Sequence, residues 1–250
     1  MIKGFKCQKG EVEFNDCSSC DRECMPRPYL DFIIDGAKDE RAMFSPSMIW
    51  NCPRNVLLNQ YYEVFIQPQQ RYWLFFGTMT HTILEQWNRP GLIKEKRIKF
   101  NLGNYKLSGQ PDCLSPKEDG TYELIDFKTI KMISLDKEGQ PKWEWLKKKD
   151  YIGQLSVYAH GLKQHGIEVT SAKLYYFAKM DESNHVPLPT CLAVPVEIDE
   201  KLVQDAVKRL DFIKGYYDLK KLPAIEECQK EYRWKCERYC EYYQTCMEVG

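Results

Sequence analysis

Two acidic residues and a lysine are spaced so that they could hold a metal ion and act on a phosphate group. Asp112 follows Pro111 near the end of one expected strand. Thirteen residues separate it from Asp126, which lies with Lys128 at the end of the next strand. Asp126 and Lys128 are two positions apart, so their side chains share one face of a strand. If the strands are neighbours, Asp112 joins them, and two converging carboxylates require a cation because they repel each other. A hard divalent ion with oxygen ligands fits, and Lys128 beside it could orient a water or stabilise charge on a phosphate oxygen.

Two helical segments could add ligands to this set. His81 ends the sequence Gly-Thr-Met-Thr-His, one turn into an expected helix, with Glu85 four residues later on the same face. An imidazole nitrogen is a possible metal ligand. Gln154 and Tyr158 are also four residues apart, so an amide and a phenol that could bind phosphate oxygens or metal-bound water share a helix face. Each feature also has a purely structural interpretation, as a helix histidine, a helix–sheet seam or a solvated strand.

The elements that must position these residues alternate between helices and strands. The residue pattern predicts helices over 46–62, 77–87, 143–165 and 198–219, and strands over 94–101, 105–114, 121–128, 172–179 and 190–197. Turns are expected at 101–104 and 117–120, a loop at 136–141, and a stiff connector at 25–28. This order predicts an α/β fold with a mixed central sheet flanked by helices.

The overall composition is that of a folded protein. The 250 residues are 43% hydrophobic and 29% charged, which excludes a disordered chain, and the formal net charge is zero. Any surface that binds a nucleic acid must therefore be a local basic patch. No stretch approaches the ~20 apolar residues that span a bilayer. The N-terminal residues turn polar at once, unlike a signal peptide, so a cytoplasmic or other intracellular setting is expected.

Eleven cysteines are an odd and high number for such a chain. Without a secretion signal, metal-bound thiolates in a reducing compartment explain them better than disulfides do. Four of them form the spacing Cys7-x9-Cys17-x2-Cys20-x3-Cys24, which suits Zn²⁺ and predicts a small zinc-ribbon-like segment. This segment could contact DNA, dock a partner or serve only as a structural cap. Cys113 and Cys191 are interpreted as ordinary buried thiols.

In their order along the chain, these motifs resemble a known family. Gly-x-x-x-His, Pro-Asp, Asp-x-Lys and Gln-x-x-x-Tyr together resemble the RecB-like branch of the PD-(D/E)XK nucleases, over roughly 45–158. The resemblance implies a restriction-endonuclease-like core with Lys128 as the catalytic lysine. It implies that Gln154 and Tyr158 help to position the metal site and the DNA. It also implies Mg²⁺ or Mn²⁺ held by His81, Asp112, Asp126 and the backbone carbonyl of Phe127.

A second resemblance concerns the other cysteines. Residues 45–54 look like the segment that carries the first cluster cysteine in iron–sulfur RecB-like nucleases, here Cys52. The resemblance implies a [4Fe-4S] cluster completed by Cys236, Cys240 and Cys246. The family usually has two residues between the first pair of these three, where this chain has three, so Cys228 is an alternative ligand. Four thiolates would also suit Zn²⁺. The pattern is similar to the CRISPR-adaptation nucleases, their phage relatives and the nuclease domains of some helicase-nucleases.

These expectations divide the chain into three parts: a zinc-binding segment at 1–28, a nuclease core at 29–225, and a segment at 226–250 that completes the iron–sulfur site. The expected activity is metal-dependent hydrolysis of DNA by an exonuclease or overhang-trimming nuclease that acts on single-stranded ends. A run of basic and aromatic residues over 128–150 suits a single strand, although a solvated helix face would look the same. The alternative is a catalytically silent DNA-binding or adaptor subunit of a recombination or CRISPR-adaptation complex. The complete Asp, Asp and Lys set argues against that alternative.

Overall fold

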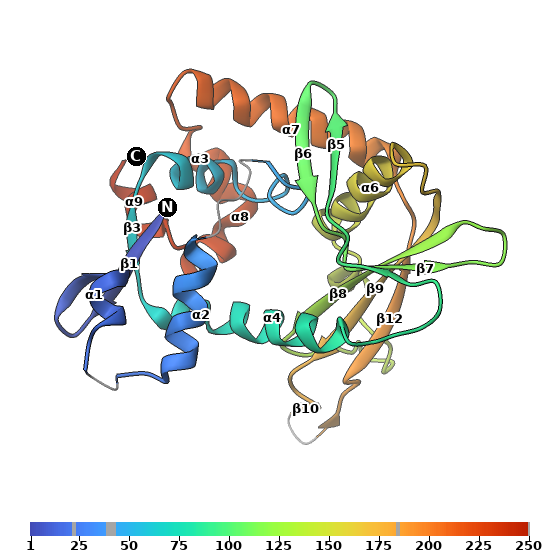
Figure 1. Cartoon of the computed structure of the whole chain (residues 1–250), viewed down its shortest axis with the longest axis horizontal. Coiled ribbons are helices and arrows are strands. Elements are labelled where there is room, and N and C mark those ends of the chain that lie inside the picture. Colours follow the sequence, from blue (N-terminus) through green and yellow to red (C-terminus); the bar gives the residue numbers. More distant parts are fainter. Residues whose placement is uncertain (22–23, 39–43, 184–185, 250) are drawn as a thin grey trace. The chain divides into compact units, whose positions relative to one another are not determined.

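The computed structural model describes residues 1–21, 24–38, 44–183 and 186–249 (Figure 1). Its contacts divide the chain into two compact units. Unit 1 combines residues from 1–43, 51–76 and 211–250, and unit 2 combines 44–50 with 77–210. Unit 2 is therefore nearly continuous in sequence, whereas unit 1 is assembled from three separated segments.

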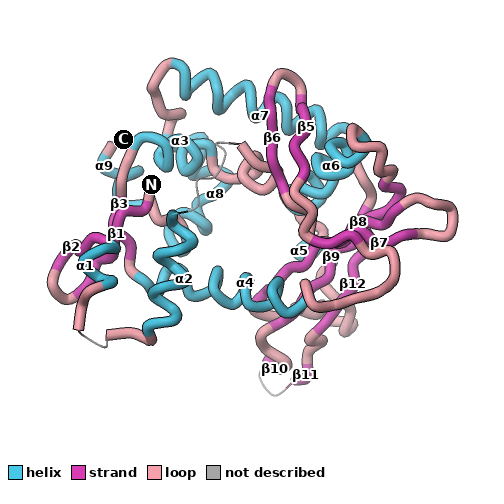
Figure 2. The backbone as a smooth tube through the Cα atoms, viewed as in Figure 1, coloured by secondary structure: helices cyan, strands magenta, loops and turns pink. Residues whose placement is uncertain are grey.

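Unit 2 contains a mixed five-stranded sheet in the order β12-β9-β8-β7-β4. Figure 2 labels its strands β12, β9, β8 and β7. The pair β8–β9 is parallel and the other neighbouring pairs are antiparallel. The strands β5 and β6 form a separate hairpin, as do β10 and β11. The elements of this unit are the C-terminal part of α4 (Tyr72–Leu84), β4 (Ile93–Lys94), β5 (Ile98–Leu102), β6 (Tyr105–Gly109), β7 (Cys113–Pro116), β8 (Tyr122–Ile130), α5 (Trp143–Leu146), α6 (Lys149–Lys163), β9 (Val169–Ala178), β10 (Glu182–Ser183), β11 (Val186–Pro187), β12 (Cys191–Val196) and most of α7 (Glu200–Asp218).

The strand β8 is the centre of this sheet and is covered on both faces. Four successive residues of β8, from Leu124 to Phe127, are buried, as is typical of a strand that lies between two layers. On one face, Ile125 and Phe127 pack against Leu84 at the end of α4. On the other face, Lys128 contacts Gln154 of α6. The predicted mixed sheet flanked by helices is confirmed.

Unit 1 contains a three-stranded sheet in the order β2-β1-β3, with β1 antiparallel to β2 and parallel to β3. Its core includes Phe5 of β1, Ile33 of α2, Leu58 of α3 and Tyr242 near α9. The elements are β1 (Ile2–Cys7), β2 (Gly10–Glu13), α1 (Phe14–Ser18), α2 (Arg27–Lys38), α3 (Pro53–Tyr61), β3 (Val64–Ile66), a 3-10 turn η1 (Pro68–Arg71), the start of α4, the end of α7, α8 (Ile225–Tyr239) and α9 (Tyr243–Glu248). Within the described ranges, no helix has the length and apolar character needed to cross a membrane.

The helix predicted over 46–62 is wrong in its first half. Residues 46–50 form turns, and α3 begins only at Pro53. Proline lacks the N–H that a helix interior requires and disfavours helical backbone at the residue before it. Cys52 accordingly has extended-type dihedrals, φ −55° and ψ 125°. The expected connector at 25–28 is also wrong in part, because α2 already begins at Arg27.

The predicted strands over 94–101 and 105–114 are each divided in two. The gaps fall at 95–97 and 110–112. The helix predicted over 143–165 is likewise divided into α5 and α6, and the helix predicted over 77–87 is the second half of α4. The strands predicted over 121–128, 172–179 and 190–197, and the helix over 198–219, are confirmed within a few residues.

Candidate active site

The candidate site lies where β8 continues beyond its partner β7. The pairing of these strands ends at Cys113 opposite Ile125, so residues 126–130 of β8 have no partner from β7. Asp112 lies directly before β7, and its Oδ2 accepts a hydrogen bond of 2.7 Å from the backbone N–H of Phe127. Asp112 thus precedes a strand, whereas the sequence predicted that it would lie near the end of one. It nevertheless reaches the strand that carries Asp126.

Asp126 and Lys128 lie on the face of β8 that is covered by α6. Lys128 Nζ is 2.7 Å from Asp126 Oδ2, donates a hydrogen bond of 3.3 Å to Gln154 Oε1, and lies 4.8 Å from the ring centre of Tyr151. Asp126 is only 4% exposed, and its Oδ2 accepts no hydrogen bond of regular geometry from the described residues, despite the nearby ammonium. A buried carboxylate oxygen that accepts no regular hydrogen bond still has lone pairs with which it can coordinate a cation.

His81 and an unexpected carboxylate complete the site. His81 Nδ1 is 3.6 Å from Asp112 Oδ1. The ligand atoms of His81, Glu95 and Asp112 all lie within 4.8 Å of one another, and this is the one such set of three or more His, Cys, Asp or Glu in the part of the chain that the structure describes. The expected neighbour of His81 was Glu85, but α4 ends at Leu84 and Glu85 is not a member of the set.

Glu95 is held by an unusual backbone conformation. Its φ of 48° is uncommon for a residue other than glycine. Its N–H donates to the carbonyl of Asp112 at 3.2 Å, and its carboxylate accepts a hydrogen bond from Gln110 Nε2. Arg97 in turn donates to Gln110 Oε1 at 3.0 Å. No residue pattern indicates this conformation, because Glu95 lies in a charged run that resembles an exposed strand.

Tyr158 contacts the backbone near Asp112. Its hydroxyl donates to the carbonyl of Gln110 at 3.2 Å and accepts from the N–H of Gln110 at 3.3 Å. The tyrosine is buried, and burial raises its pKa to about 12. Gly109 permits this approach, since a Cβ at that position would lie 2.6 Å from the Tyr158 ring. Tyr158 therefore fixes the segment that carries Gln110 and Asp112.

The electrostatics of the site favour a bound cation. Burial, together with the neighbouring Asp126 carboxylate, raises the pKa of Asp112 to about 8. Burial opposes the charge on Lys128, but the Asp126 carboxylate outweighs that effect and the pKa of Lys128 is raised. A divalent cation beside Asp112 would favour its ionised form, as opposite charges do. Carboxylate oxygens suit Mg²⁺ or Mn²⁺, and a histidine nitrogen suits Mn²⁺ better than Mg²⁺.

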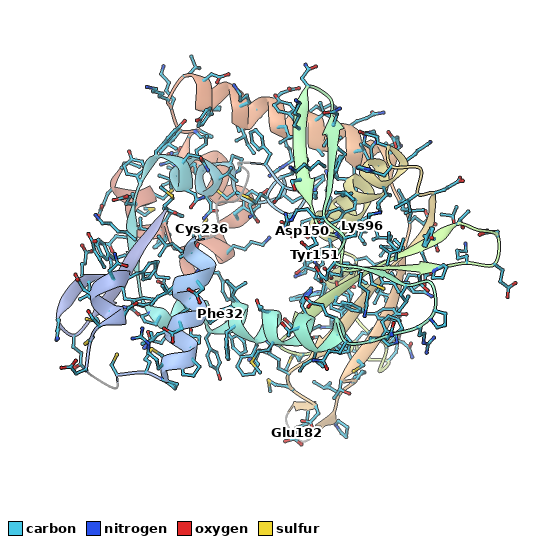
Figure 3. The ribbon with its side chains drawn as sticks, in the orientation of Figure 1. Phe32, Lys96, Asp150, Tyr151, Glu182 and Cys236 are labelled. Atoms are coloured by element: carbon cyan, nitrogen blue, oxygen red, sulfur yellow. The ribbon has the colours of Figure 1, made fainter. Side chains whose placement is uncertain are left out.

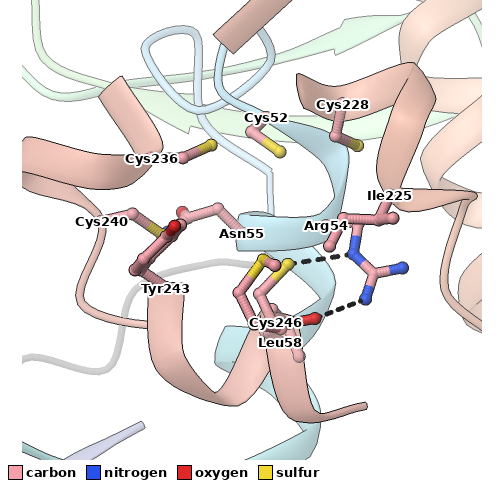
Figure 4. A pocket seen from close by; sticks show the side chains of 11 residues that line it. Cys52, Arg54, Asn55, Leu58, Ile225, Cys228, Cys236, Cys240, Tyr243 and Cys246 are labelled. Carbon is pink, nitrogen blue, oxygen red and sulfur yellow. Dashed lines mark hydrogen bonds between the residues drawn. The ribbon is translucent and has the colours of Figure 1, made fainter. Parts of the chain in front are cut away.

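A separate group of thiols lies in unit 1. All four cysteines expected to bind a cluster line one pocket together with the alternative ligand (Figure 4): Cys52, Cys228, Cys236, Cys240 and Cys246. The first turn of α3 supplies two N–H donors to these sulfurs. Arg54 Nε donates to Cys246 Sγ at 3.1 Å, and Asn55 Nδ2 donates to Cys240 Sγ at 3.3 Å. A hydrogen bond from Cys228 lowers the pKa of Cys52 to about 6.

The N-terminal cysteines surround another pocket of unit 1. Cys7 at the end of β1, Cys17 in α1, and Cys20 and Cys24 beyond it all line this pocket. The N–H of Lys9 donates to Cys7 Sγ at 3.3 Å. These four residues thus line a common space. By contrast, Cys191 is exposed and not buried as predicted, whereas Cys113 is buried as predicted.

Comparisons with known proteins identify a family and similar solved structures. The chain resembles the protein of the crystal structure of SSO0001 with 16% identity and a TM-score of 0.51, over 90% of this chain and 94% of that one. A phage-related exonuclease from Haemophilus somnus 129PT is similar at 14% identity and a TM-score of 0.45, over 72% of this chain and 95% of that one. No curated protein matches the sequence. The family model described as the PD-(D/E)XK nuclease superfamily matches residues 76–247, which include the whole candidate site, and the chain therefore belongs to that superfamily.

Proposed function

We propose that the chain is a divalent-metal-dependent deoxyribonuclease that acts on single-stranded DNA ends or overhangs. The observation that carries this proposal is the convergence of His81, Glu95 and Asp112 beside the ion pair of Asp126 and Lys128. Hydrolysis of a phosphodiester requires that charge on the phosphate be neutralised and that a water be positioned for attack. The site offers cation ligands and a fixed ammonium group at one end of β8.

The proposed metal is Mg²⁺ or Mn²⁺, held by His81, Asp112, Asp126 and the carbonyl of Phe127. Support for the carbonyl comes from the hydrogen bond between Phe127 N–H and Asp112. The N–H and C=O of one strand residue point to the same side, so this carbonyl also faces the unpaired edge of β8. Glu95 is added as a further ligand because its carboxylate belongs to the set around His81.

The bound cation would supply Lewis acidity to the phosphate and lower the pKa of a coordinated water. Lys128 stays protonated beside Asp126 and donates to a phosphate oxygen, where it stabilises the charge that develops during attack by water. Gln154 and Tyr151 hold the amine of Lys128 in place. Tyr158 acts at a distance, because it fixes the segment that positions Asp112 and Glu95.

The test is hydrolysis of an end-labelled single strand, a blunt duplex and an RNA strand, each with Mg²⁺ or Mn²⁺. Asp126→Asn and Lys128→Ala should each lower kcat by about 100-fold or more, since each removes electrostatic stabilisation of the reaction. Glu118→Gln and Lys106→Ala are matched controls, because both side chains are exposed and remote from the site. Undiminished cleavage in both site variants would refute the assignment. Tight DNA binding without hydrolysis by the wild-type chain would favour the silent adaptor instead.

We also propose that the thiols of unit 1 hold a [4Fe-4S] cluster, which would place the chain in the iron–sulfur RecB-like branch with the CRISPR-adaptation and phage nucleases. Support comes from the common pocket and from the N–H donors of Arg54 and Asn55, which would stabilise thiolate ligands. Anaerobic purification followed by iron, sulfide and zinc analysis tests this. Serine variants of Cys228 and Cys236 would show which of the two is a ligand, with the exposed Cys191→Ser as control.

For the N-terminal thiols we propose a Zn²⁺ site of Cys7, Cys17, Cys20 and Cys24. It is supported by their shared pocket and by the two-residue spacing within it. The expected result is one zinc per chain that is lost in Cys17→Ser. Full retention of zinc in that variant would contradict the proposal.

A further inference from the structure

Two tryptophans on the short helix α5 are exposed although their size favours burial. Trp143 is 42% exposed and Trp145 is 63% exposed. They are two positions apart on a helix, so their side chains diverge by about 200° and the rings cannot cover each other. Exposed large apolar groups in a folded protein commonly mark a binding surface.

The helix that carries them is firmly attached to unit 2. Leu146 is buried, and its carbonyl accepts a hydrogen bond from Tyr176 of β9. The preceding loop is closed by a bridge between Leu135 and Pro141. The N–H of Lys142 also donates to Ser134 at 3.0 Å. The two rings are thus presented by a fixed element, which reduces the entropy lost when a ligand binds.

Basic side chains connect this helix to the candidate active site. Lys142 precedes α5, and Lys147 and Lys148 follow it. Tyr151, which is labelled in Figure 3, lies at the start of α6. Lys148 Nζ lies 5.3 Å from the centre of its ring, and Lys128 Nζ lies 4.8 Å from the same ring. Tyr151 therefore joins the basic segment after α5 to the lysine of the site.

We propose that α5 and the lysines beside it form a platform for single-stranded DNA, with one unpaired base stacked on Trp143 and another on Trp145 at the opposite side of the helix. Phosphates then follow the lysines towards Lys128. Base–aromatic stacking with a basic track is the usual way in which proteins hold a single strand without reading its sequence. A duplex cannot use such rings, because its bases are already stacked inside the helix. This inference rests on the proposed nuclease function. It adds the element that makes the chain prefer single-stranded to double-stranded DNA.

The test measures binding of a labelled 20-nucleotide oligo-dT and of a blunt 20-base-pair duplex by fluorescence anisotropy. Every chain carries Asp126→Asn to suppress cleavage. Trp143→Ala combined with Trp145→Ala should weaken oligo-dT binding by roughly tenfold or more and change duplex binding much less. Phe212→Ala is the control, since Phe212 is as exposed as Trp143 and lies in unit 1. Lys147→Ala should reduce the slope of log K against log salt concentration by about one, because one phosphate contact is lost. The tryptophan variants should leave this slope unchanged.

Unchanged oligo-dT affinity in the double variant, or an equal loss for single strand and duplex, would overturn the platform. The nuclease proposal fails separately. Its failure would appear as absent hydrolysis by the wild-type chain with Mg²⁺ and Mn²⁺, whatever the binding data show.

Discussion

The carboxylate site of unit 2 and the thiol pocket of unit 1 are built in opposite ways. The carboxylate site uses one stretch of chain, 81–158, with each ligand on or next to a regular element. The thiol pocket joins Cys52 to cysteines that lie more than 170 residues later. Asp126 of the carboxylate site is 4% exposed, whereas four of the pocket cysteines remain partly exposed: Cys52, Cys236, Cys240 and Cys246.

The two regions also differ in what holds these carboxylates and thiols in place. In unit 2, Asp112 is fixed by a backbone N–H and Glu95 by Gln110. In unit 1, the sulfurs of Cys240 and Cys246 are fixed by side-chain donors from α3. The carboxylate site is thus tied to the sheet of unit 2. The thiol pocket links α3 to the C-terminal helices α8 and α9. Loss of metal should consequently affect chemistry in one region and folding in the other.

The largest expected difference between the two regions comes from the substitution Cys52→Ser. We expect loss of iron and a fall in Tm of roughly 10 °C or more, because a structural metal contributes several kcal/mol of folding free energy. Calorimetry and iron analysis measure both effects, with Cys191→Ser as control. A variant that loses iron but keeps the wild-type Tm would show that the pocket does not stabilise unit 1.

In the other region, Glu95→Gln should weaken the apparent affinity for Mn²⁺ by about 10- to 100-fold, as expected when an anionic ligand or its close support is lost. Activity should recover at high Mn²⁺, and the iron content should not change. Hydrolysis titrated with Mn²⁺ measures this, and Glu118→Gln serves as the matched control. Loss of kcat that no Mn²⁺ concentration restores would show that Glu95 acts other than as a metal ligand.

The pH dependence of metal binding should distinguish the carboxylate site further. The pKa of Asp112 is about 8, so protons compete with Mg²⁺ below that value. Apparent Mg²⁺ affinity should rise by about tenfold per pH unit up to about pH 8 and then level off. Titration calorimetry at several pH values measures this, and a flat profile would contradict the raised pKa.

The same pKa gives the opposite trend for the stability of the metal-free chain. The folded pKa lies above the ordinary value of 3.8, so the folded state holds more protons than the unfolded state between about pH 4 and pH 8. Stability should therefore fall as pH rises through this window, and Asp112→Asn should reduce the slope. Chemical denaturation measures it, and a wild-type slope retained in the variant would assign the effect to another group.

The smallest expected effect is that of Asn55→Ala. It removes one N–H donor to Cys240 in unit 1, which should lower stability by about 1 kcal/mol. Denaturant unfolding of the metal-loaded chain measures this. Hydrolysis in unit 2 should stay at the wild-type rate, and a large loss of hydrolysis would show that the two regions are coupled.

The sequence predicted those parts of the site that depend on local spacing. Asp126 and Lys128 were placed together because a strand puts alternate residues on one face, and the structure confirms their proximity. Glu95 was missed, since its role depends on a positive φ and on contacts with Gln110 and Asp112. Tyr151 was missed because its ring contact with Lys128 follows from the packing of α6 on β8.

The fold, like the site, could be predicted from the sequence only where local residue patterns determine it. The alternation of helices and strands was predictable, and so was the start of α7 near Glu200. The false helix start at Pro46 arose because two prolines, Pro46 and Pro53, each suit a first turn. Pro46 instead packs near Gly109 in unit 2, a contact between residues far apart in sequence that local patterns do not contain.

The interrupted course of unit 1 has a consequence for biosynthesis. A ribosome releases the N-terminal part of a chain first, and segments that form local contacts fold soonest. The whole 77–210 segment of unit 2 emerges before α8 and α9 exist, so it has all of its own partners while Cys52 still lacks Cys240 and Cys246. The thiol pocket can therefore form only after the last two helices have been synthesised, so unit 1 is completed later than the carboxylate site.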